Sequence, residues 1–370
     1  MKDQRLSTRL GQYIKQVLPD AHGHQHKAFV DFAAALVVAG SCCQASMART
    51  FTSFEAAAKR LSRFLGNERI DPDEVSLSTL EYVAFQLRWA SAVRLVIDWT
   101  VEDRQHLLVA SLVVGGRAVP IFWRAYGADE LKGRTREYEE RLIGEVLDSI
   151  VANIDASRVT VTADRAFATA SHFDLLDSYG VGFVIRSKGS VTVWFSGQWH
   201  KLSSLRFTGN QRRRVLGRIA YCQSDPRQLW VCQARARDRC GNWGVWHMVS
   251  NHAFSAEEFV YEYRRRFNCE HAFRDGKRLL GFADARIADI SAWSRMFALV
   301  ALTMIALVGL GYHMLRRRAA LKARTRAVAS RRRARREISI IHNMLLLVRR
   351  DPALWDQFDP TAFAIPDTAL

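Results

Sequence analysis

The chain has 370 residues, of which 49% are hydrophobic and 25% charged, a composition that excludes a wholly disordered protein. This length is enough for one large domain or for two to three smaller ones. The formal net charge of +17 indicates a polyanionic partner, most commonly nucleic acid. A basic soluble protein without such a partner is the alternative, since net charge bears on association and not on fold.

The cysteine pattern and the N-terminus bear on the cellular compartment. The spacing of the six cysteines matches neither a zinc knuckle nor paired CxxC motifs, so no structural zinc site or disulfide framework is expected. The first twenty residues contain no apolar segment of the secretory kind. We therefore expect a reducing, cytoplasmic environment.

Residues 1–92 are expected to form a helical region. Apolar residues recur at helical spacing over 27–38 and 56–65, and the second segment carries basic residues on another face. The Asp-Pro-Asp cluster at 71–73 predicts a break, and a further helix is expected over 77–92. A DNA-binding region fits this pattern, and a simple helical cap on the next domain is the alternative.

Residues 93–188 change to strand-like runs rich in β-branched and aromatic residues. The expected order is a three-stranded meander, then helix, strand, helix and strand, which is the layout of a mixed-sheet α/β domain. Gly115 and Gly116 form a hairpin signal between the second and third strands. The expected strands span 94–100, 106–114, 117–127, 158–164 and 180–188, and the expected helices span 134–154 and 168–178.

The rest of the chain divides into three parts. Residues 189–252 have an all-β pattern rich in Trp and Arg, and are expected to be an insertion before a long helix within 253–295. Residues 296–370 are expected to be helical and basic. Within them, 316–336 contains eleven Arg or Lys and no acidic residue, which favours a helix that follows DNA phosphates.

The run at 296–315 has the length and apolarity of a membrane span and is followed by three arginines. A fully buried helix in a large α/β core gives the same pattern. Because the chain also carries a pattern of strand-end carboxylates, the buried helix is the favoured interpretation, and no membrane partner is expected.

Two aspartates stand at the ends of expected strands. Asp98 comes late in an apolar strand, where an unpaired carboxylate would be costly, and Asp164 directly follows another. The carboxyl ends of strands are where α/β sheets place their sites. With Glu270 on a later helix, these residues supply hard oxygen ligands suited to two Mg²⁺ or Mn²⁺ ions. Such a site activates a nucleophile and stabilises the leaving oxygen in phosphodiester displacement.

The helix around Glu270 carries further polar residues. At about 100° per residue, one side of this helix carries four polar residues within roughly 60° of one another. They form a stripe along the helix: Tyr263, Arg266, Glu270 and Lys277. A solvated face with an Arg266–Glu270 ion pair is the alternative, and it accounts for two of the four residues. Four other acidic residues are weaker candidates because they point away from this stripe or lack a strand-end position; they are Asp275, Glu102, Asp103 and Asp289.

These residues lie in three blocks: Asp98-Trp99-Thr100, then Asp164-Arg165-Ala166-Phe167, and a Tyr-x2-Arg-x3-Glu-x6-Lys motif that begins at Tyr263. The blocks resemble the signatures of bacterial DDE transposases of the insertion-sequence-4 family. The third block matches the family's spacing at all four positions. The resemblance covers about residues 29–282.

The resemblance implies a ribonuclease-H-like mixed-sheet core, interrupted by the β-rich insertion and flanked by the helical terminal regions. It implies that Asp98, Asp164 and Glu270 are the catalytic metal ligands. It also implies contacts with the DNA ends and with a displaced base. The residues expected to make them are Tyr263, Arg266, Lys277 and Arg165, with Trp194, Trp199 and Trp230 as candidates for base stacking.

The expected function is cut-and-paste transposition. The enzyme would cut at the terminal inverted repeats of an insertion sequence and join the ends to target DNA, as a homodimer on double-stranded DNA in the bacterial cytoplasm. A non-catalytic DNA-binding relative that acts as an inhibitor or regulator is the alternative, and its mark would be a lost carboxylate. The sequence also leaves open a stand-alone nuclease of the same fold and a membrane-anchored protein.

Overall fold

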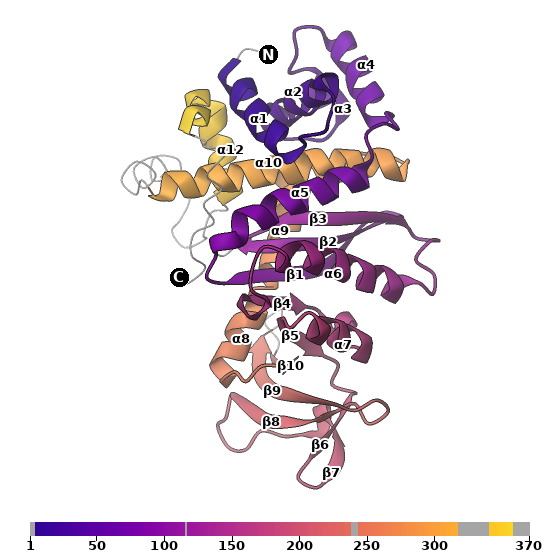
Figure 1. Cartoon of the computed structure of the whole chain (residues 1–370), viewed down its shortest axis with the longest axis vertical. Coiled ribbons are helices and arrows are strands. Elements are labelled where there is room, and N and C mark those ends of the chain that lie inside the picture. Colours follow the sequence, from indigo (N-terminus) through magenta and orange to yellow (C-terminus); the bar gives the residue numbers. More distant parts are fainter. Residues whose placement is uncertain (1–3, 115–116, 238–242, 317–339, 358–370) are drawn as a thin grey trace.

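The computed structural model describes residues 4–114, 117–237, 243–316 and 340–357. It is a mixed α/β structure built on one ten-stranded sheet (Figure 1). The N-terminal helices and the helix α10 lie at one end of this sheet, and the strands β6 to β9 lie at the other end. The expected α/β class is therefore confirmed.

The N-terminal region is helical as expected, but two of its helices, α1 and α3, were not expected. The expected break is present over residues 66–71, between α4 and α5, but α5 begins at Pro72 and not at residue 77 as expected. The Asp71 side chain accepts a hydrogen bond from the Asp73 N–H, and Pro72 takes the first helical position, where its missing N–H costs nothing. The elements are α1 (Gln4–Val17), α2 (Gly23–Ala39), α3 (Gln44–Ala48), α4 (Phe54–Leu65), α5 (Pro72–Gln86) and a 3₁₀ turn, Leu87–Trp89.

The first five strands follow one another along the chain in the expected order. In the sheet they are arranged β3-β2-β1-β4-β5, with β3 at the edge. β1 pairs antiparallel with β2 and parallel with β4, and β4 pairs parallel with β5. Residues 115–116, where a glycine hairpin was expected, lie outside the described residues. The elements are β1 (Val93–Glu102), β2 (Gln105–Val114), β3 (Arg117–Gly127), α6 (Thr135–Val151), β4 (Val159–Ala163), α7 (Ala170–Ser178) and β5 (Gly182–Ser187).

The β-rich region at 189–252 continues this sheet. β10 pairs antiparallel with β5, so the hydrogen-bonded ladder passes from the core into the insertion without interruption. Beyond β10 the order is β9-β8-β6-β7, which places the β6–β7 hairpin at the far edge. The strands are β6 (Thr192–Phe195), β7 (Gln198–Lys201), β8 (Arg213–Tyr221), β9 (Arg227–Arg237) and β10 (Trp243–Ser250).

The expected long helix from Ser255 is divided into α8 (Ala256–Arg264) and α9 (Phe267–Leu279). Ser255 caps α8 and accepts a hydrogen bond from the Glu258 N–H. At the division, the N–H groups of Arg265 and Arg266 donate to carbonyls three residues back. This tighter 3₁₀ pattern replaces the four-residue spacing of the α-helix and changes the helix phase.

Helix α10 (Ile290–Arg316) includes the apolar run and begins before residue 296. Its segment Ile290–Gly311 is long and apolar enough to cross a membrane, but 94% of the apolar window is buried inside the protein. α10 packs against β3, α2, α5 and α12 (Ile340–Arg350), as Figure 1 shows where it runs between the N-terminal helices and the sheet. After Arg316, the rest of the basic stretch, 317–336, where a helix was expected, lies outside the described residues.

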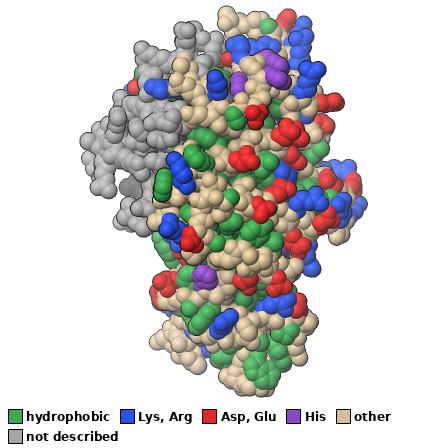
Figure 2. Space-filling view, in the orientation of Figure 1, with side chains coloured by type: hydrophobic (Ala, Val, Ile, Leu, Met, Phe, Trp, Pro, Cys, Tyr) green, Lys and Arg blue, Asp and Glu red, His purple; other side chains and the backbone are tan. Residues whose placement is uncertain are grey.

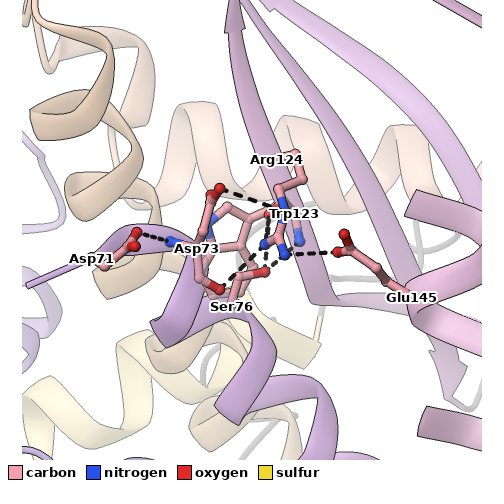
Figure 3. Close-up of polar contacts among 6 residues, drawn as sticks. All are labelled: Asp71, Asp73, Ser76, Trp123, Arg124 and Glu145. Atoms are coloured by element: carbon pink, nitrogen blue, oxygen red, sulfur yellow. Dashed lines mark hydrogen bonds and ion pairs between the residues drawn. The ribbon is translucent and has the colours of Figure 1, made fainter. Parts of the chain in front are cut away.

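A cluster of polar contacts joins the N-terminal helices to the core (Figure 3). The buried Ser76 hydroxyl of α5 donates to the Trp123 carbonyl of β3, and the Trp123 N–H donates back to it at 2.8 Å. Beside them, the Arg124 guanidinium of β3 donates to the Glu145 carboxylate of α6 at 2.7 Å. One helix of the N-terminal region is thereby tied to the edge strand and to a core helix.

Charge is unevenly distributed on the face drawn in Figure 2. Basic side chains gather over the α4 end of the molecule, and acidic side chains are more frequent over its middle. The exposed cations of α4 include Lys59 and Arg63. This distribution places part of the positive charge of the chain on the N-terminal helices, where a DNA-binding region was expected.

Candidate active site

The two predicted aspartates lie side by side where the parallel pairing of β1 with β4 ends, although β1 itself continues to Glu102. Ile97 of β1 is in register with Ala163 of β4, so Asp98 and Asp164, the next residue of each strand segment, are neighbours across the ladder. Side chains alternate along β1. Asp98 therefore shares the sheet face of Val96, which packs against Cys269 of α9.

The Arg266 side chain connects two of the three predicted carboxylates. Its guanidinium donates to Asp98 Oδ2 at 2.7 Å and to Glu270 Oε1 at 2.5 Å. The arginine side chain is 8% exposed, against 16% for Asp98 and 23% for Glu270. Charge-assisted hydrogen bonds of this kind are short and fix geometry, so Arg266 holds the strand carboxylate and the helix carboxylate together.

Asp164, the third predicted carboxylate, contacts the stripe through Tyr263. The Tyr263 hydroxyl donates to Asp164 Oδ1 at 3.5 Å, and its ring is fully buried. α8 is held in place beside it by Glu262, which accepts hydrogen bonds from Arg94 of β1, the closer at 2.8 Å. Tyr263 and Arg266 therefore link Asp164, Asp98 and Glu270, although the helix is divided between them.

Lys277, the last residue of the stripe, contacts the end of β1. Its ammonium lies 2.7 Å from Glu102 Oε2 and donates to the Val101 carbonyl at 2.8 Å. Glu102 is the last residue of β1, so the expectation that it lacks a strand-end position is wrong. Its contact with Lys277 gives this carboxylate a cation partner of its own.

The other acidic residues judged weaker from the sequence have different surroundings. Asp275 is buried, and Asp289 caps α10 by accepting a hydrogen bond from the Ala292 N–H at 2.7 Å. Asp103 is exposed and adopts a positive φ of 53° in the turn after β1. Asp289 thus serves a helix terminus and Asp103 belongs to a turn, so Glu270 is kept as the helix carboxylate of the site.

Burial raises the pKa of Asp98 to about 6, and the negative charge of Asp164 adds to the rise, while the Arg266 guanidinium opposes it. A buried carboxylate whose charge is disfavoured, next to a second carboxylate, forms a site suited to a cation. Their oxygen donors are the type that Mg²⁺ and Mn²⁺ prefer. The donor chemistry of Asp98 and Asp164 therefore fits a divalent ion.

Glu270 has a different part in this arrangement, because its Oε1 is bonded to Arg266. Among the residues that the structure describes, no group of three or more His, Cys, Asp or Glu side chains is placed to hold a metal ion. A three-carboxylate site would therefore require the Glu270 side chain to exchange its bond with Arg266 for a metal.

The tryptophans chosen from the sequence lie at different distances from the site along the sheet. Trp194 and Trp199 pack edge to face on the β6–β7 hairpin, at the far edge of the sheet from β1. Trp230 belongs to the apolar cluster beneath α8. Arg165, which follows Asp164, is exposed and available to a ligand.

Trp246 of β10 is the insertion tryptophan that packs directly against the stripe. Its ring centroid lies 5.3 Å from that of Tyr263 and 5.5 Å from that of Phe267. The sequence shows five tryptophans in this region, and only the pairing of β10 with β5 reveals which of them meets α8 and α9. Trp246 was therefore missed as a candidate.

A second group of residues that was not predicted from the sequence lies on the opposite face of the sheet and supports the strand that carries Asp98. Trp99 of β1 donates its indole N–H to Glu139 of α6 at 2.7 Å, while its backbone N–H donates to Asp98 Oδ1 at 3.0 Å. The other oxygen of Glu139 lies 3.5 Å from Nε2 of the buried His172 of α7. One buried carboxylate thus connects the residue after Asp98 to the helix that follows Asp164.

The fold and this cluster define a mixed α/β protein with acidic residues gathered where the parallel pairing of two adjacent strands ends. Residues 135–306, somewhat less than half of the chain, match the family model described as the transposase DDE domain. The match includes Asp164 and Glu270, whereas Asp98 precedes it. No curated protein matches the chain. The family match supports a DDE transposase, a DNA-acting protein of transposition and recombination.

Proposed function

We propose that this protein is a cut-and-paste transposase of the insertion-sequence-4 family with a ribonuclease-H-like core. In this proposal Asp98, Asp164 and Glu270 bind two Mg²⁺ or Mn²⁺ ions and form the catalytic site. The observation that carries the proposal is the register of β1 with β4, which makes Asp98 and Asp164 neighbours, together with the Arg266 bridge to Glu270. The strand order β3-β2-β1-β4-β5 supports the proposed core.

The reaction we propose is a series of phosphoryl transfers without a covalent enzyme intermediate. Water attacks a phosphodiester at the end of the element, the bond from phosphorus to the 3′ oxygen breaks, and that oxygen takes a proton to become a 3′-OH. The hydroxyl then attacks the opposite strand in the family's manner, which closes a hairpin and releases the 3′-OH of the flanking DNA. A second water opens the hairpin and restores the terminal 3′-OH, which attacks target DNA and displaces a 3′-OH of the target strand. Bound Mg²⁺ supplies activation of the attacking oxygen and stabilisation of the leaving oxygen.

The chain's own side chains prepare this site. Arg266 keeps the Asp98 and Glu270 carboxylates close together until a metal cation takes its place between them. Tyr263 fixes one oxygen of Asp164, and Lys277 keeps the end of β1 against α9. The cations of this stripe, with Arg165, are then placed to bind the phosphates of the element ends.

The proposal includes a homodimer on double-stranded DNA, because two element ends are cut together. It also keeps five parts of the chain as units: 1–92 for DNA binding, 93–188 and 253–295 for catalysis, 189–252 as the insertion, and 296–370 as the basic C-terminal region. The protein acts in the bacterial cytoplasm, on the nucleoid when bound.

The test is cleavage of a DNA fragment that carries the element's own ends, with and without Mg²⁺, by the wild type and two variants. We expect Glu270→Gln to lose at least about a hundredfold in rate while still binding the fragment, because a metal ligand is lost and the fold is kept. Asp103→Asn is the matched control: it removes an exposed carboxylate from a turn whose positive φ suits Asn, and should cut normally.

Each other outcome has a definite meaning. Equal cleavage by the wild type and Glu270→Gln would remove Glu270 from the site. DNA binding without cleavage by the wild type would favour a non-catalytic relative that acts as an inhibitor or regulator. Cleavage without joining to a target duplex would indicate a stand-alone nuclease.

A further inference from the structure

A cavity of about 840 Å³ lies in the β-rich region, away from the carboxylates. It is formed between the loop after β7 and the ends of strands β9 and β10. The side chains that give it its character are three arginines and two aromatic residues, with Val245 beside them; they are Arg206, Arg212, Arg235, Phe207 and Trp243. Cavities of this size hold small ligands or parts of larger ones.

The cavity opens on the face of the sheet opposite to α8. Ala234 of β9 and Trp246 of β10, which are paired in the ladder, both belong to the cluster under α8. Their neighbours Arg235 and Val245, also paired, therefore point to the other face, where they line the cavity. This site is thus separate from the Trp246 and Tyr263 contact next to the predicted catalytic residues.

The cavity combines positive charge with aromatic surface. Two guanidinium groups lie over the Phe207 ring, with Arg235 at 5.1 Å and Arg214 at 5.4 Å from its centroid. Arg214 is fixed by two hydrogen bonds to the buried Gln233, the shorter at 2.8 Å. Arg235 is exposed, and Trp243 is 60% exposed. Phe207 is therefore next to one fixed cation and one solvent-facing cation.

The described residues that line the cavity include no Asp or Glu. A cation is therefore an unsuitable ligand, and an anion with flat apolar parts is a suitable one. Guanidinium groups bind phosphates, and aromatic side chains stack on bases without regard to sequence. In a duplex the bases are stacked on one another, so only an unpaired strand offers both features at once.

We propose that this cavity binds an unpaired DNA strand, with a base on Phe207 or Trp243 and the backbone phosphates on Arg206, Arg212 and Arg235. The inference rests on the proposed function, since strand cleavage at the element ends would produce such a strand. Its position on the opposite face of the sheet makes it a holding site for the strand that is not reacting.

The test uses a fluorescent oligothymidylate of about 12 nucleotides and a duplex of the same length, measured by anisotropy in EDTA so that no cleavage intervenes. We expect Arg235→Ala to weaken binding of the oligothymidylate about tenfold and to reduce its salt dependence by about 0.7 in the logarithmic slope. Duplex binding should change much less. Arg218→Ala is the matched control, an exposed arginine of β8 that is paired with Trp230 on the α8 face.

A second pair of variants separates stacking from charge. Phe207→Leu should weaken oligothymidylate binding about as much, whereas Phe207→Tyr should keep it, because the aromatic face is retained. Equal effects of Arg235→Ala and Arg218→Ala, or no effect of Phe207→Leu, would overturn the proposal. If the wild type cuts element ends while the cavity variants bind normally, the cavity assignment fails and the transposase stands. If the cavity variants lose binding but the wild type never cuts, the cavity assignment stands and the proposed transposase function fails.

Discussion

Glu139 is a buried carboxylate placed between Trp99 and His172, beneath the strand that carries Asp98. Burial raises its pKa to about 7, although the hydrogen bond from Trp99 opposes the rise. Burial also lowers the pKa of His172. Nδ1 of His172 lies 2.9 Å from the Thr169 hydroxyl and 3.2 Å from the Phe167 carbonyl, while Nε2 faces Glu139. This environment suits a neutral acid.

The substitution Glu139→Gln should therefore stabilise the protein at neutral and higher pH. The folded state holds its proton up to about pH 7 while the unfolded state releases it near 4.5, so stability is lost as pH rises through this range. At about 1.4 kcal/mol per pH unit, the penalty approaches roughly 3 kcal/mol above pH 7. Gln keeps the Trp99 bond and carries no charge.

Urea unfolding of the wild type and Glu139→Gln at about pH 5 and about pH 8 measures this effect. The variant should gain stability at the higher pH and little at the lower one. The same difference at both values would mean that packing, and not ionisation, separates the two proteins.

At the residue scale, a residue's place in the site can be predicted from the sequence where it depends only on that residue's own strand or helix. Asp98 is predicted because it comes late in an apolar strand and Asp164 because it directly follows one; the structure makes them neighbours, although β1 continues for four residues past Asp98. Glu139, by contrast, has the sequence appearance of a surface residue in a polar helix. Its burial depends on Trp99 and His172, which come from other elements, and no local pattern shows this.

At the scale of elements, boundaries depend on contacts that hydrophobic spacing does not show. The division between α8 and α9 contains neither Pro nor Gly, and it falls where Arg266 turns inward to Asp98. The early start of α5 at Pro72 could have been found from the Asp-Pro pair, since aspartate is a good cap and proline suits the first turn. The same pair also occurs in breaks, so the sequence alone left both interpretations open.

The docking of α5 on β3 provides a prediction at this scale. Ser76→Ala should lower the free energy of unfolding by about 1–3 kcal/mol, because the Trp123 N–H and carbonyl both lose a buried partner. The control is Ser78→Ala on the same helix, where the side chain is partly exposed and alanine favours the helix. Thermal unfolding of both variants compares them, and equal melting temperatures would show that the Ser76 contacts contribute nothing.

At the scale of the whole molecule, one sheet and one helix connect the regions. The sheet passes from the core into the β-rich region through the pairing of β5 with β10, which the sequence did not predict because pairing partners far apart leave no local pattern. Helix α10 contacts the N-terminal helices, the edge strand β3 and α9. Gly276 of α9 approaches it closely: a Cβ there would lie 3.5 Å from both Val300 and Met304. The position of α9, and of Glu270 on it, therefore depends on α10.

This arrangement predicts how α10 responds to charge. Val300→Asp places a carboxylate at a fully buried position within the hydrophobic core, and should cost more than about 4 kcal/mol, enough to unfold or aggregate the protein. The matched control is Ser291→Asp, which puts the same charge in the first turn of α10, where the helix dipole favours it by a few tenths of a kcal/mol.

High-speed sedimentation of lysates without detergent, followed by thermal unfolding of the supernatant protein, distinguishes the two variants. The wild type and Ser291→Asp should remain in the supernatant and melt alike, because α10 is covered by the protein's own elements. A wild type that sediments with membranes and is released only by detergent would mean that α10 is a membrane span, and the hydrophobic core could not then form around it.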